Sequence, residues 1–287
     1  KLVRKWIPLM NNGQHDSNDV KQRAIDLHRQ HGGKITTQLA FPIDTADGLS
    51  LAYTPGVGAV SAAIAEDESE SFSLTARGRT VAVVSDGSAV LGLGDIGPAA
   101  GHAVMEGKAA LLKSFANVDA VPLSIATQET DEIVRFVEQI EPSFAGVNLE
   151  DIAAPRCFEI EERLQQSLDI PVFHDDQHGT AIVVSAALHN AAEVVGKAYD
   201  ELRVVVIGAG AAGIAVSKLL LGIDGALGSY EQTGEQQVGD VLLVDSSGIV
   251  HTGREDLNPY KAAIAERSNH AELDGDLATA MEGADVV

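Results

Sequence analysis

The sequence predicts an α/β protein built on parallel sheets. From about residue 80 onward, short apolar and β-branched runs alternate with longer segments of helical periodicity. Continuous apolar strands are typical of parallel sheets buried on both faces, and strands that alternate with helices form βαβ units. The predicted strands are TVAVVS at 80–85, DAVPLSI at 119–125, FAGVNL at 144–149, IPVF at 170–173, RVVVIG at 203–208 and DVLLVD at 240–245.

The predicted helices lie mainly between these strands. One further helix is expected near 18–31, followed by loop to about residue 50. The stretch 222–239, GIDGALGSYEQTGEQQVG, is rich in Gly, Gln and Glu and is predicted to be a surface insertion. The helices between the strands are predicted near 102–115, 129–140, 155–168, 178–196 and 211–221.

Length and composition favour a globular protein of two domains. At roughly 150 residues per domain, a chain of 287 residues suffices for two. A new α/β unit opens near residue 195, so we expect domains at 1–195 and 196–287. The hydrophobic share of 45% excludes a disordered chain. The chain begins at Lys1 and stops at 283–287, which has the pattern of a beginning strand, so we expect a fragment that lacks C-terminal residues.

Several compartments and partners are disfavoured. No run approaches 18 uninterrupted apolar residues, so we expect no transmembrane helix, and residues 1–13 do not have the pattern of a secretory signal. The single cysteine, Cys157, excludes an internal disulfide framework and a cysteine-based zinc site. We therefore expect a cytoplasmic protein.

The charge balance also restricts the partners. Lys and Arg number 20 against 42 Asp and Glu, a net charge of −22. Such a chain repels nucleic acid and anionic membrane surfaces, so we expect neither as a partner. An anionic substrate would require a metal ion or a few well-placed cations.

A glycine-rich turn follows the strand at 203–208. In RVVVIGAGAAG, the residues Gly208, Gly210 and Gly213 form a G-x-G-x-x-G pattern between a strand and an apolar helix. The first glycine permits the turn, the second lets a pyrophosphate approach the backbone, and the third lets the helix pack closely. This context predicts a Rossmann-type dinucleotide-binding domain. The alternative is an incidental tight turn.

The strand DVLLVD ends in an acid suited to the adenosine ribose. Asp245 lies 245 − 208 = 37 residues after the first glycine, and the insertion at 222–239 explains the long spacing. Asp224 is nearer, but no strand precedes it. An acid here repels a 2′-phosphate, and Ser246 and Ser247 offer no cation, so NAD is favoured over NADP. The alternatives are that Asp245 caps the strand end, or that Lys218 or Arg254 lies near the pocket.

Paired acids follow two strands of the first domain. Glu150 and Asp151 come after FAGVNL, and Asp175 and Asp176 come after IPVF and His174. If these strands are neighbours, four carboxylates meet at one sheet edge, which is costly without a cation. Oxygen ligands suit Mg²⁺ or Mn²⁺. The alternative is that the acids cap helix N-termini.

Other candidates are weaker. His174 and His178 are four residues apart, but the strand ends at the first histidine, which disfavours zinc. Cys157 falls in a helical pattern and is predicted to be a packing residue. Neither Tyr53, before a Thr-Pro-Gly turn, nor Lys108, near a helix start, is identified as catalytic by its position alone.

Five segments together resemble the malic enzymes, in particular the compact prokaryotic type. FHDDQHGTAI and NLEDIAAPRCFEIE are the most specific parts of the resemblance, which spans most of the chain. The matching segments are LSLAYTPGVG at 49–58, VAVVSDGSAVLGLGDIGPAAGHAVMEGKAALLKSFANVDAVPL at 81–123, EPSFAGVNLEDIAAPRCFEIEERL at 141–164, IPVFHDDQHGTAIV at 170–183 and VVVIGAGAAGIAVSKLLL at 204–221.

The resemblance implies roles for individual residues. Tyr53 matches the general acid, Lys108 the general base, and Asp175 the carboxylate beside that lysine. The residues that match the divalent-metal ligands are Glu150, Asp151 and Asp176. The loop 90–97 is expected to line the nicotinamide and substrate side of the cleft. The dinucleotide turn comprises Gly208, Ala209, Gly210, Ala211, Ala212 and Gly213.

The resemblance also implies an activity: metal-dependent oxidative decarboxylation of L-malate to pyruvate and CO2 with reduction of NAD or NADP, in a homodimer or higher homo-oligomer. A malolactic enzyme that releases lactate and a noncatalytic nucleotide-binding module are the alternatives. The chain departs from larger relatives at Ala89, where they carry a substrate-binding arginine. The family's substrate-binding asparagines are expected beyond residue 287.

Overall fold

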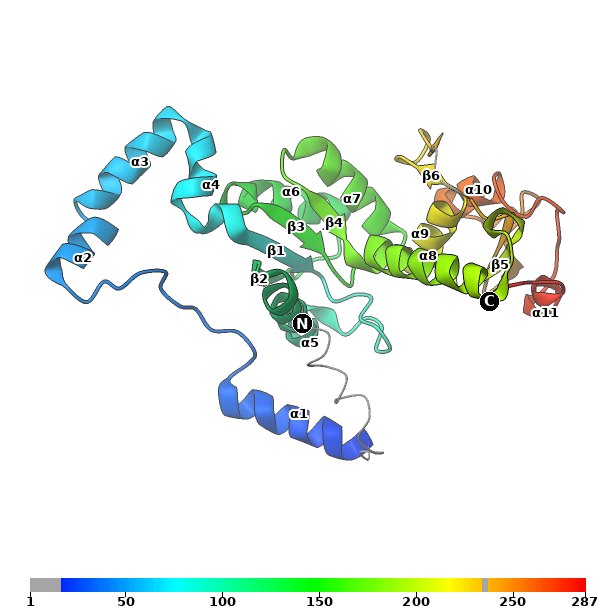
Figure 1. Cartoon of the computed structure of the whole chain (residues 1–287), viewed down its shortest axis with the longest axis horizontal. Coiled ribbons are helices and arrows are strands. Elements are labelled where there is room, and N and C mark those ends of the chain that lie inside the picture. Colours follow the sequence, from blue (N-terminus) through cyan, green and yellow to red (C-terminus); the bar gives the residue numbers. More distant parts are fainter. Residues whose placement is uncertain (1–16, 234–236) are drawn as a thin grey trace.

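The computed structural model describes residues 17–233 and 237–287 (Figure 1). Residues 1–13, in which we expected no secretory signal, lie outside the described residues, as do residues 234–236 of the predicted insertion. The helix expected near 18–31 is α1 (Ser17–His31).

The first sheet has four parallel strands in the order β2-β1-β3-β4. They coincide with the first four predicted strands and are β1 (Thr80–Ser85), β2 (Asp119–Ser124), β3 (Gly146–Leu149) and β4 (Val172–His174). In Figure 1 two helices lie on one side of this sheet, α6 (Thr130–Ile140) and α7 (Arg156–Ser167). Helix α5 (Gly97–Leu111), which a π-helical turn extends to residue 116, packs against β1 and β2 on the other side.

The second sheet pairs the remaining two predicted strands. β5 (Arg203–Ile207) lies parallel to β8 (Asp240–Asp245), and β9 (Gly248–Ile249) adds an antiparallel edge. Val286 forms a parallel bridge with Val204, so the chain end does approach this sheet as a strand would. This second unit also contains α9 (Ala211–Leu220), α10 (Pro259–Ala265), α11 (Leu277–Met281) and, within the predicted insertion, the hairpin of β6 (Ile223–Asp224) and β7 (Glu231–Gln232).

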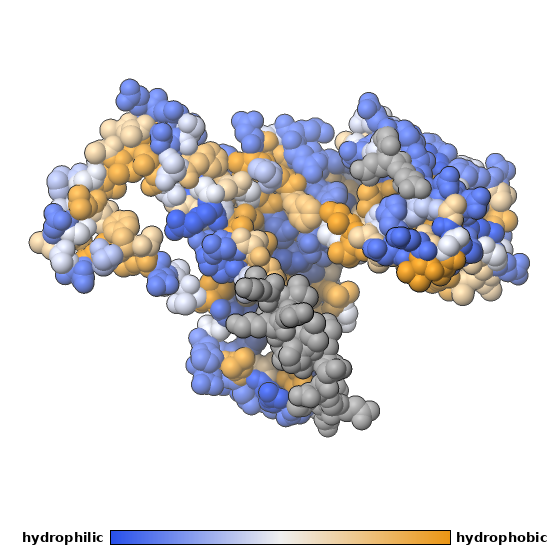
Figure 2. All heavy atoms as spheres, viewed as in Figure 1, coloured by the Kyte–Doolittle hydropathy of each residue, from blue (hydrophilic) through white to orange (hydrophobic). Residues whose placement is uncertain are grey.

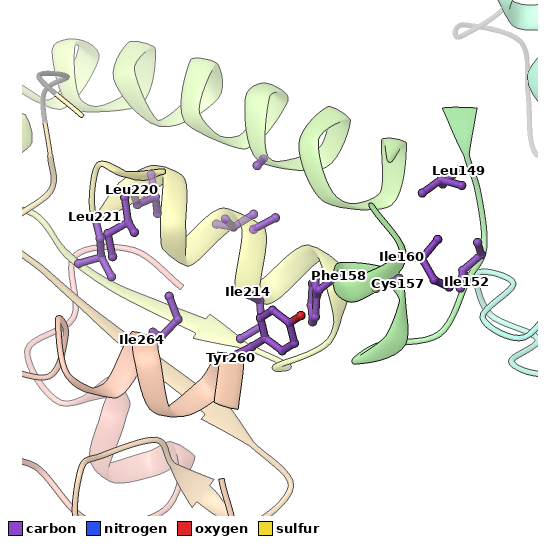
Figure 3. Close-up of a cluster of buried hydrophobic side chains, with 14 of the residues drawn as sticks. Leu149, Ile152, Cys157, Phe158, Ile160, Ile214, Leu220, Leu221, Tyr260 and Ile264 are labelled. Carbon is purple, nitrogen blue, oxygen red and sulfur yellow. The ribbon is translucent and has the colours of Figure 1, made fainter. Parts of the chain in front are cut away.

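One hydrophobic core joins the two units. Helix α8 (Asp175–Val195) begins at the end of the first sheet and packs along α9 of the second unit. In Figure 3 the rings of Phe158 on α7 and Tyr260 on α10 lie together beside Ile214 on α9, with ring centroids 4.5 Å apart. Cys157 is fully buried in the same cluster, which confirms its packing role.

Residues 46–66 stand apart from this body, whereas Lys34, before them, bonds Glu106 and the Ala103 carbonyl on α5. Helices α2 (Ala46–Ala52) and α3 (Gly56–Glu66) contain no buried residue, and Figure 2 shows apolar side chains on their surface, at the left of the view. Residues 46–66 reach the length and mean hydropathy of a membrane-crossing helix, contrary to expectation. A break at residues 53–55 divides them into helices of 7 and 11 residues, each short of the ~20 residues that a span requires.

Candidate active site

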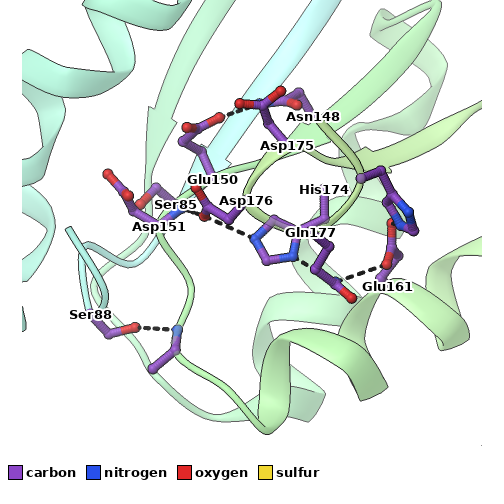
Figure 4. Close-up of polar contacts among 12 residues, drawn as sticks. Ser85, Ser88, Asn148, Glu150, Asp151, Glu161, His174, Asp175, Asp176 and Gln177 are labelled. Carbon is purple, nitrogen blue, oxygen red and sulfur yellow. Dashed lines mark hydrogen bonds and ion pairs between the residues drawn. The ribbon is translucent and has the colours of Figure 1, made fainter. Parts of the chain in front are cut away.

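Three carboxylates meet at the carboxyl edge of the first sheet. One oxygen from each of Glu150, Asp151 and Asp176 lies within 4.8 Å of the others (Figure 4). The parallel register explains the meeting, because Leu149 of β3 lies opposite His174 of β4, and the acids follow these two residues directly. The two strands are therefore neighbours, which was the condition for their acids to meet, although Asp175 lies against Lys108 and not in the cluster.

The backbone around Asp151 brings the two pairs of acids into contact. Asp151 adopts a left-handed conformation with φ of 54°, and its N–H donates to Oδ2 of Asp176 at 2.8 Å. Asp175 and Asp176 occupy the first turn of α8, where the helix dipole favours negative charge. The helix-capping alternative thus accounts for part of their placement, but not for the convergence with Glu150 and Asp151.

The cluster has the electrostatics of a cation site. Burial and the neighbouring charge of Asp176 raise the pKa of Glu150 to about 7 and that of Asp151 to about 6. Burial alone would raise the pKa of Asp176 too, but hydrogen bonds from His174 and the Asp151 N–H lower it below its ordinary value. Among the described residues, Oδ2 of Asp151 is the one buried side-chain oxygen or nitrogen without a hydrogen-bond partner. Such a donor set fits Mg²⁺ or Mn²⁺.

Lys108 reaches this cluster from α5. Its Nζ lies 2.5 Å from Oδ2 of Asp175 and 3.1 Å from Oε1 of Glu150. Burial lowers the pKa of Lys108, but the ion pairs with the two carboxylates outweigh burial and leave the pKa above its ordinary value. The two ion pairs therefore favour the charged form of the lysine.

A second buried ion pair, which the sequence reasoning missed, lies beside the cluster. Arg156 donates to Oδ2 of Asp86 at 2.8 Å, and Asp86 is 1% exposed. The loop after Asp86 contacts the cluster through the N–H of Ala89, which donates to the carbonyl of Asp151 at 2.9 Å. The sequence could have indicated Asp86, because it is a charged residue that directly follows a buried apolar strand.

Tyr53 is not brought to this site within one chain. It lies at the end of α2 and is 67% exposed, whereas Lys108 lies on α5, away from α2 and α3 in Figure 1. The resemblance placed both residues in one active site, so a single chain leaves that part of the site incomplete.

The dinucleotide turn has the predicted form. Gly208 has φ of 103°, and a Cβ at Gly213 would lie 1.8 Å from the carbonyl oxygen of Gly208. The close packing of helix against strand therefore requires glycine at both positions. Helix α9 begins at Ala211 and includes Ala212 in its first turn. A cavity of about 420 Å³ beside the turn is lined by Ile207, Gly208, Ala209, Val244, Asp245, Ser246 and Lys261.

Asp245 is not the uncompensated acid that we expected. Oδ1 accepts from Arg254 and from the Ser247 N–H, both at 2.9 Å, and Oδ2 accepts from Arg254 at 3.2 Å and Lys261 at 2.6 Å. Burial opposes its ionisation, but the bonds from Arg254 and Lys261 hold its pKa well below the ordinary value. A carboxylate has about four acceptor positions, so none is left for ribose hydroxyls. Lys218 instead bonds the carbonyl of Gly225.

The fold and the site define a two-unit α/β protein that combines a carboxylate cation site with a dinucleotide-binding turn. Residues 32–165 match the family model "Malic enzyme, N-terminal domain", and residues 177–285 match "Malic enzyme, NAD binding domain". The crystal structure of the NAD-dependent malic enzyme from Thermotoga maritima is similar, with a TM-score of 0.85 and 48% identity over 92% of this chain and 67% of that chain. The chain belongs to the malic enzyme family.

Named relatives add detail. The chain is 52% identical to the NAD-dependent malic enzyme of Geobacillus stearothermophilus over 93% of this chain and 53% of that one. It is 47% identical to the bifunctional malic/malolactic enzyme of Bacillus subtilis over 93% of this chain and 62% of that one. Other relatives are named NADP-dependent malic enzymes. The chain thus spans between a third and about three fifths of the length of these relatives.

Proposed function

We propose that this protein catalyses the metal-dependent oxidative decarboxylation of L-malate to pyruvate and CO2, with NAD or NADP as hydride acceptor. The observation that carries the proposal is the position of Lys108, whose Nζ touches both Glu150 of the carboxylate cluster and Asp175. A candidate base, a cation site and a dinucleotide turn in one α/β chain match what this chemistry requires.

Glu150, Asp151 and Asp176 are the residues that would hold Mg²⁺ or Mn²⁺. The fit rests on their converging oxygens and on the unpartnered Oδ2 of Asp151. A bound divalent cation would supply positive charge that binds the malate oxygens, stabilises the charge left by decarboxylation and lowers the pKa of Lys108.

The chain's own groups move the protons. Lys108 in its neutral form takes the proton of the C2 hydroxyl through Nζ, while Asp175 holds that nitrogen in place. A bound dinucleotide, held at the turn of residues 208–213, would supply the acceptor for the hydride of C2. After CO2 leaves, the hydroxyl of Tyr53 donates its proton to C3 of the remaining enolate, which gives pyruvate.

We propose that Tyr53 acts in a second copy of the chain. Helices α2 and α3 bury nothing in their own chain, although Leu49, Leu51 and Tyr53 are 53%, 66% and 67% exposed. Contiguous apolar surface of this kind marks an interaction site. A homodimer in which this segment covers the partner would bury it and deliver Tyr53 to the site that lacks an acid.

We infer that Lys261, rather than Asp245, sets the coenzyme preference. The expectation of NAD depended on repulsion between Asp245 and a 2′-phosphate, but Arg254 and Lys261 compensate that charge. Lys261 also lines the cavity beside Gly208 and Ala209, where its ammonium can meet a phosphate. NADP is therefore accepted alongside NAD.

A steady-state assay tests the proposed function. With malate, Mn²⁺ and either coenzyme, we expect reduced coenzyme and pyruvate in equal amounts, and no turnover after EDTA treatment. Lactate without net reduced coenzyme would favour the malolactic reaction, which the bifunctional Bacillus subtilis relative makes the second candidate. Coenzyme binding with neither product would support the noncatalytic alternative.

A further inference from the structure

A line of hydrogen bonds runs from the carboxylate cluster into the space between α7 and α8 (Figure 4). Nε2 of His174 lies 3.1 Å from Oδ2 of Asp176, and Nδ1 of His174 lies 2.7 Å from Nε2 of Gln177. Nε2 of Gln177 also donates to Oε2 of Glu161 at 2.9 Å. His174, Gln177 and Glu161 are 0%, 6% and 5% exposed, so water does not compete for these bonds.

The donor and acceptor roles in this line follow from chemistry. The Glu161 carboxylate can only accept, so it turns the NH2 group of Gln177, rather than the amide oxygen, inward. That NH2 group can only donate, so Nδ1 of His174 must be unprotonated. The proton of the neutral imidazole therefore resides on Nε2 and points at Asp176.

Glu161 is itself held at its other oxygen. Oε1 lies 2.8 Å from Nε2 of His178, a half-exposed residue one helical turn after His174. The two histidines considered as zinc ligands therefore lie at opposite ends of one hydrogen-bond network. His178 contacts the acid on α7, and His174 contacts the acid of the cluster.

We propose that Glu161, Gln177 and His174 form a positioning network that fixes the His174 tautomer and thereby aims Asp176 at the cation. Both donors to Asp176, the His174 ring and the Asp151 N–H, bond to Oδ2. Within the described residues, no protein donor contacts Oδ1, which leaves this oxygen for a ligand. The inference rests on the proposed metal site, and hydrogen-bond partners of metal ligands commonly change metal affinity by about 10–100-fold.

The spacing of the sequence produces this network. His174 is the last residue of β4 and Gln177 lies in the first turn of α8, three residues later, so their side chains meet, and Gln177 reaches Glu161 on α7. Asp175 and Asp176, between them, face the carboxylate cluster and Lys108 instead. In the segment HDDQ the two outer residues are thus supporting residues and the two inner ones belong to the site.

The first experiment measures Mn²⁺ affinity of the whole chain by calorimetry, without substrate or coenzyme. Gln177→Met keeps the size of the side chain and removes its donor, and we expect Mn²⁺ to bind 10–100-fold more weakly. The matched control is Gln165→Met on α7, whose amide bonds only the Val172 carbonyl, at 3.3 Å. This control should bind Mn²⁺ within twofold of the wild type.

The second experiment reads the tautomer directly in the wild type, and a variant serves only to assign the signal. Long-range ¹⁵N–¹H spectra of ¹⁵N-histidine-labelled wild type should show His174 protonated on Nε2, with the signal assigned by its loss in His174→Asn. A proton on Nδ1 would overturn the proposal, as would undiminished Mn²⁺ affinity in folded Gln177→Met. Failure of the wild type to bind Mn²⁺ would instead refute the metal site on which the proposal rests.

Discussion

Nζ of Lys108 lies 3.1 Å from Oε1 of Glu150, so the proposed base and a proposed metal ligand form one ion pair. Lys108→Ala removes the proton acceptor, and we expect malate oxidation to fall by 10²–10⁴-fold. Coenzyme affinity, measured by fluorescence titration, should stay within about twofold, because the dinucleotide turn belongs to the other unit. Arg79→Ala, a surface change at the opposite end of β1, serves as the control. Turnover retained in Lys108→Ala would show that Lys108 is not the general base.

Asp151→Asn should abolish tight Mn²⁺ binding. The change keeps the size of the side chain but removes the charge of a buried oxygen that has no protein partner. Calorimetry should show affinity at least 100-fold weaker, whereas Asp200→Asn, an exposed acid outside the cluster, should bind as the wild type does. Equal affinity in both variants would mean that the cation binds elsewhere.

Mixing two inactive variants tests whether Tyr53 acts in the partner copy. After equal amounts of Tyr53→Phe and Lys108→Ala are dissociated and reassociated, half of the dimers are mixed. Each mixed dimer then has one site with both residues intact, so about one quarter of wild-type activity should return. If Tyr53 acts within its own chain, no site regains both residues, and the mixture stays as inactive as its components.

Lys261→Gln tests the coenzyme assignment. The substitution removes the ammonium from the cavity beside Gly208, and we expect kcat/KM with NADP to fall about tenfold, which corresponds to about 1.4 kcal/mol. The value with NAD should hold or rise, because Asp245 regains an acceptor position. Asp245→Asn is the informative partner variant. If Asp245→Asn changes the ratio of kcat/KM between NADP and NAD while Lys261→Gln does not, then Asp245 sets the preference, as the sequence predicted.

Asp245→Asn should also destabilise the fold in a pH-dependent way. Because the folded-state pKa lies below the ordinary value of 3.8, ionised Asp245 contributes stability above about pH 4, and this contribution is lost as pH falls below that value. We expect a loss of about 2 kcal/mol in the free energy of unfolding at pH 7. Urea unfolding should show the gap to wild type shrinking at pH 3, and a gap independent of pH would contradict the ion pair. The control is Asp256→Asn, which removes the exposed partner of Arg254.

The sequence predicted what depends on local pattern. The six strands were recognisable because each is a short, mainly apolar run between helical segments, and the meeting of Glu150 with Asp176 followed from parallel strands ending at one edge. Asp175 and Asp176 proved to lie inside α8, which begins three residues before its predicted start. The helix begins earlier because the two acids are themselves stabilising in the first turn of a helix.

What could not be predicted depends on how elements pack. Arg254 and Lys261 follow Asp245 by nine and sixteen residues, and only the fold of the intervening turns brings their side chains back to the strand end. Pairing of Arg156 with Asp86 spans 70 residues for the same reason. The distance of Tyr53 from the site is a third case, because the proposed contact with a second copy of the chain would leave no pattern within one sequence.

Helix α8 restricts how the two halves of this protein can be recombined. It carries Asp175 and Asp176 in its first turn, yet its buried Leu188 and Ala192 share a core with Ile214 of the dinucleotide unit. A chimera joined near residue 195 would pack this helix against an α9 from another protein. Its buried side chains would then either lose their packing contacts or overlap sterically with the new ones. Exchange of the coenzyme-binding half for one of different specificity would therefore disturb the helix that carries the acids, unless the incoming α9 presents a matching face.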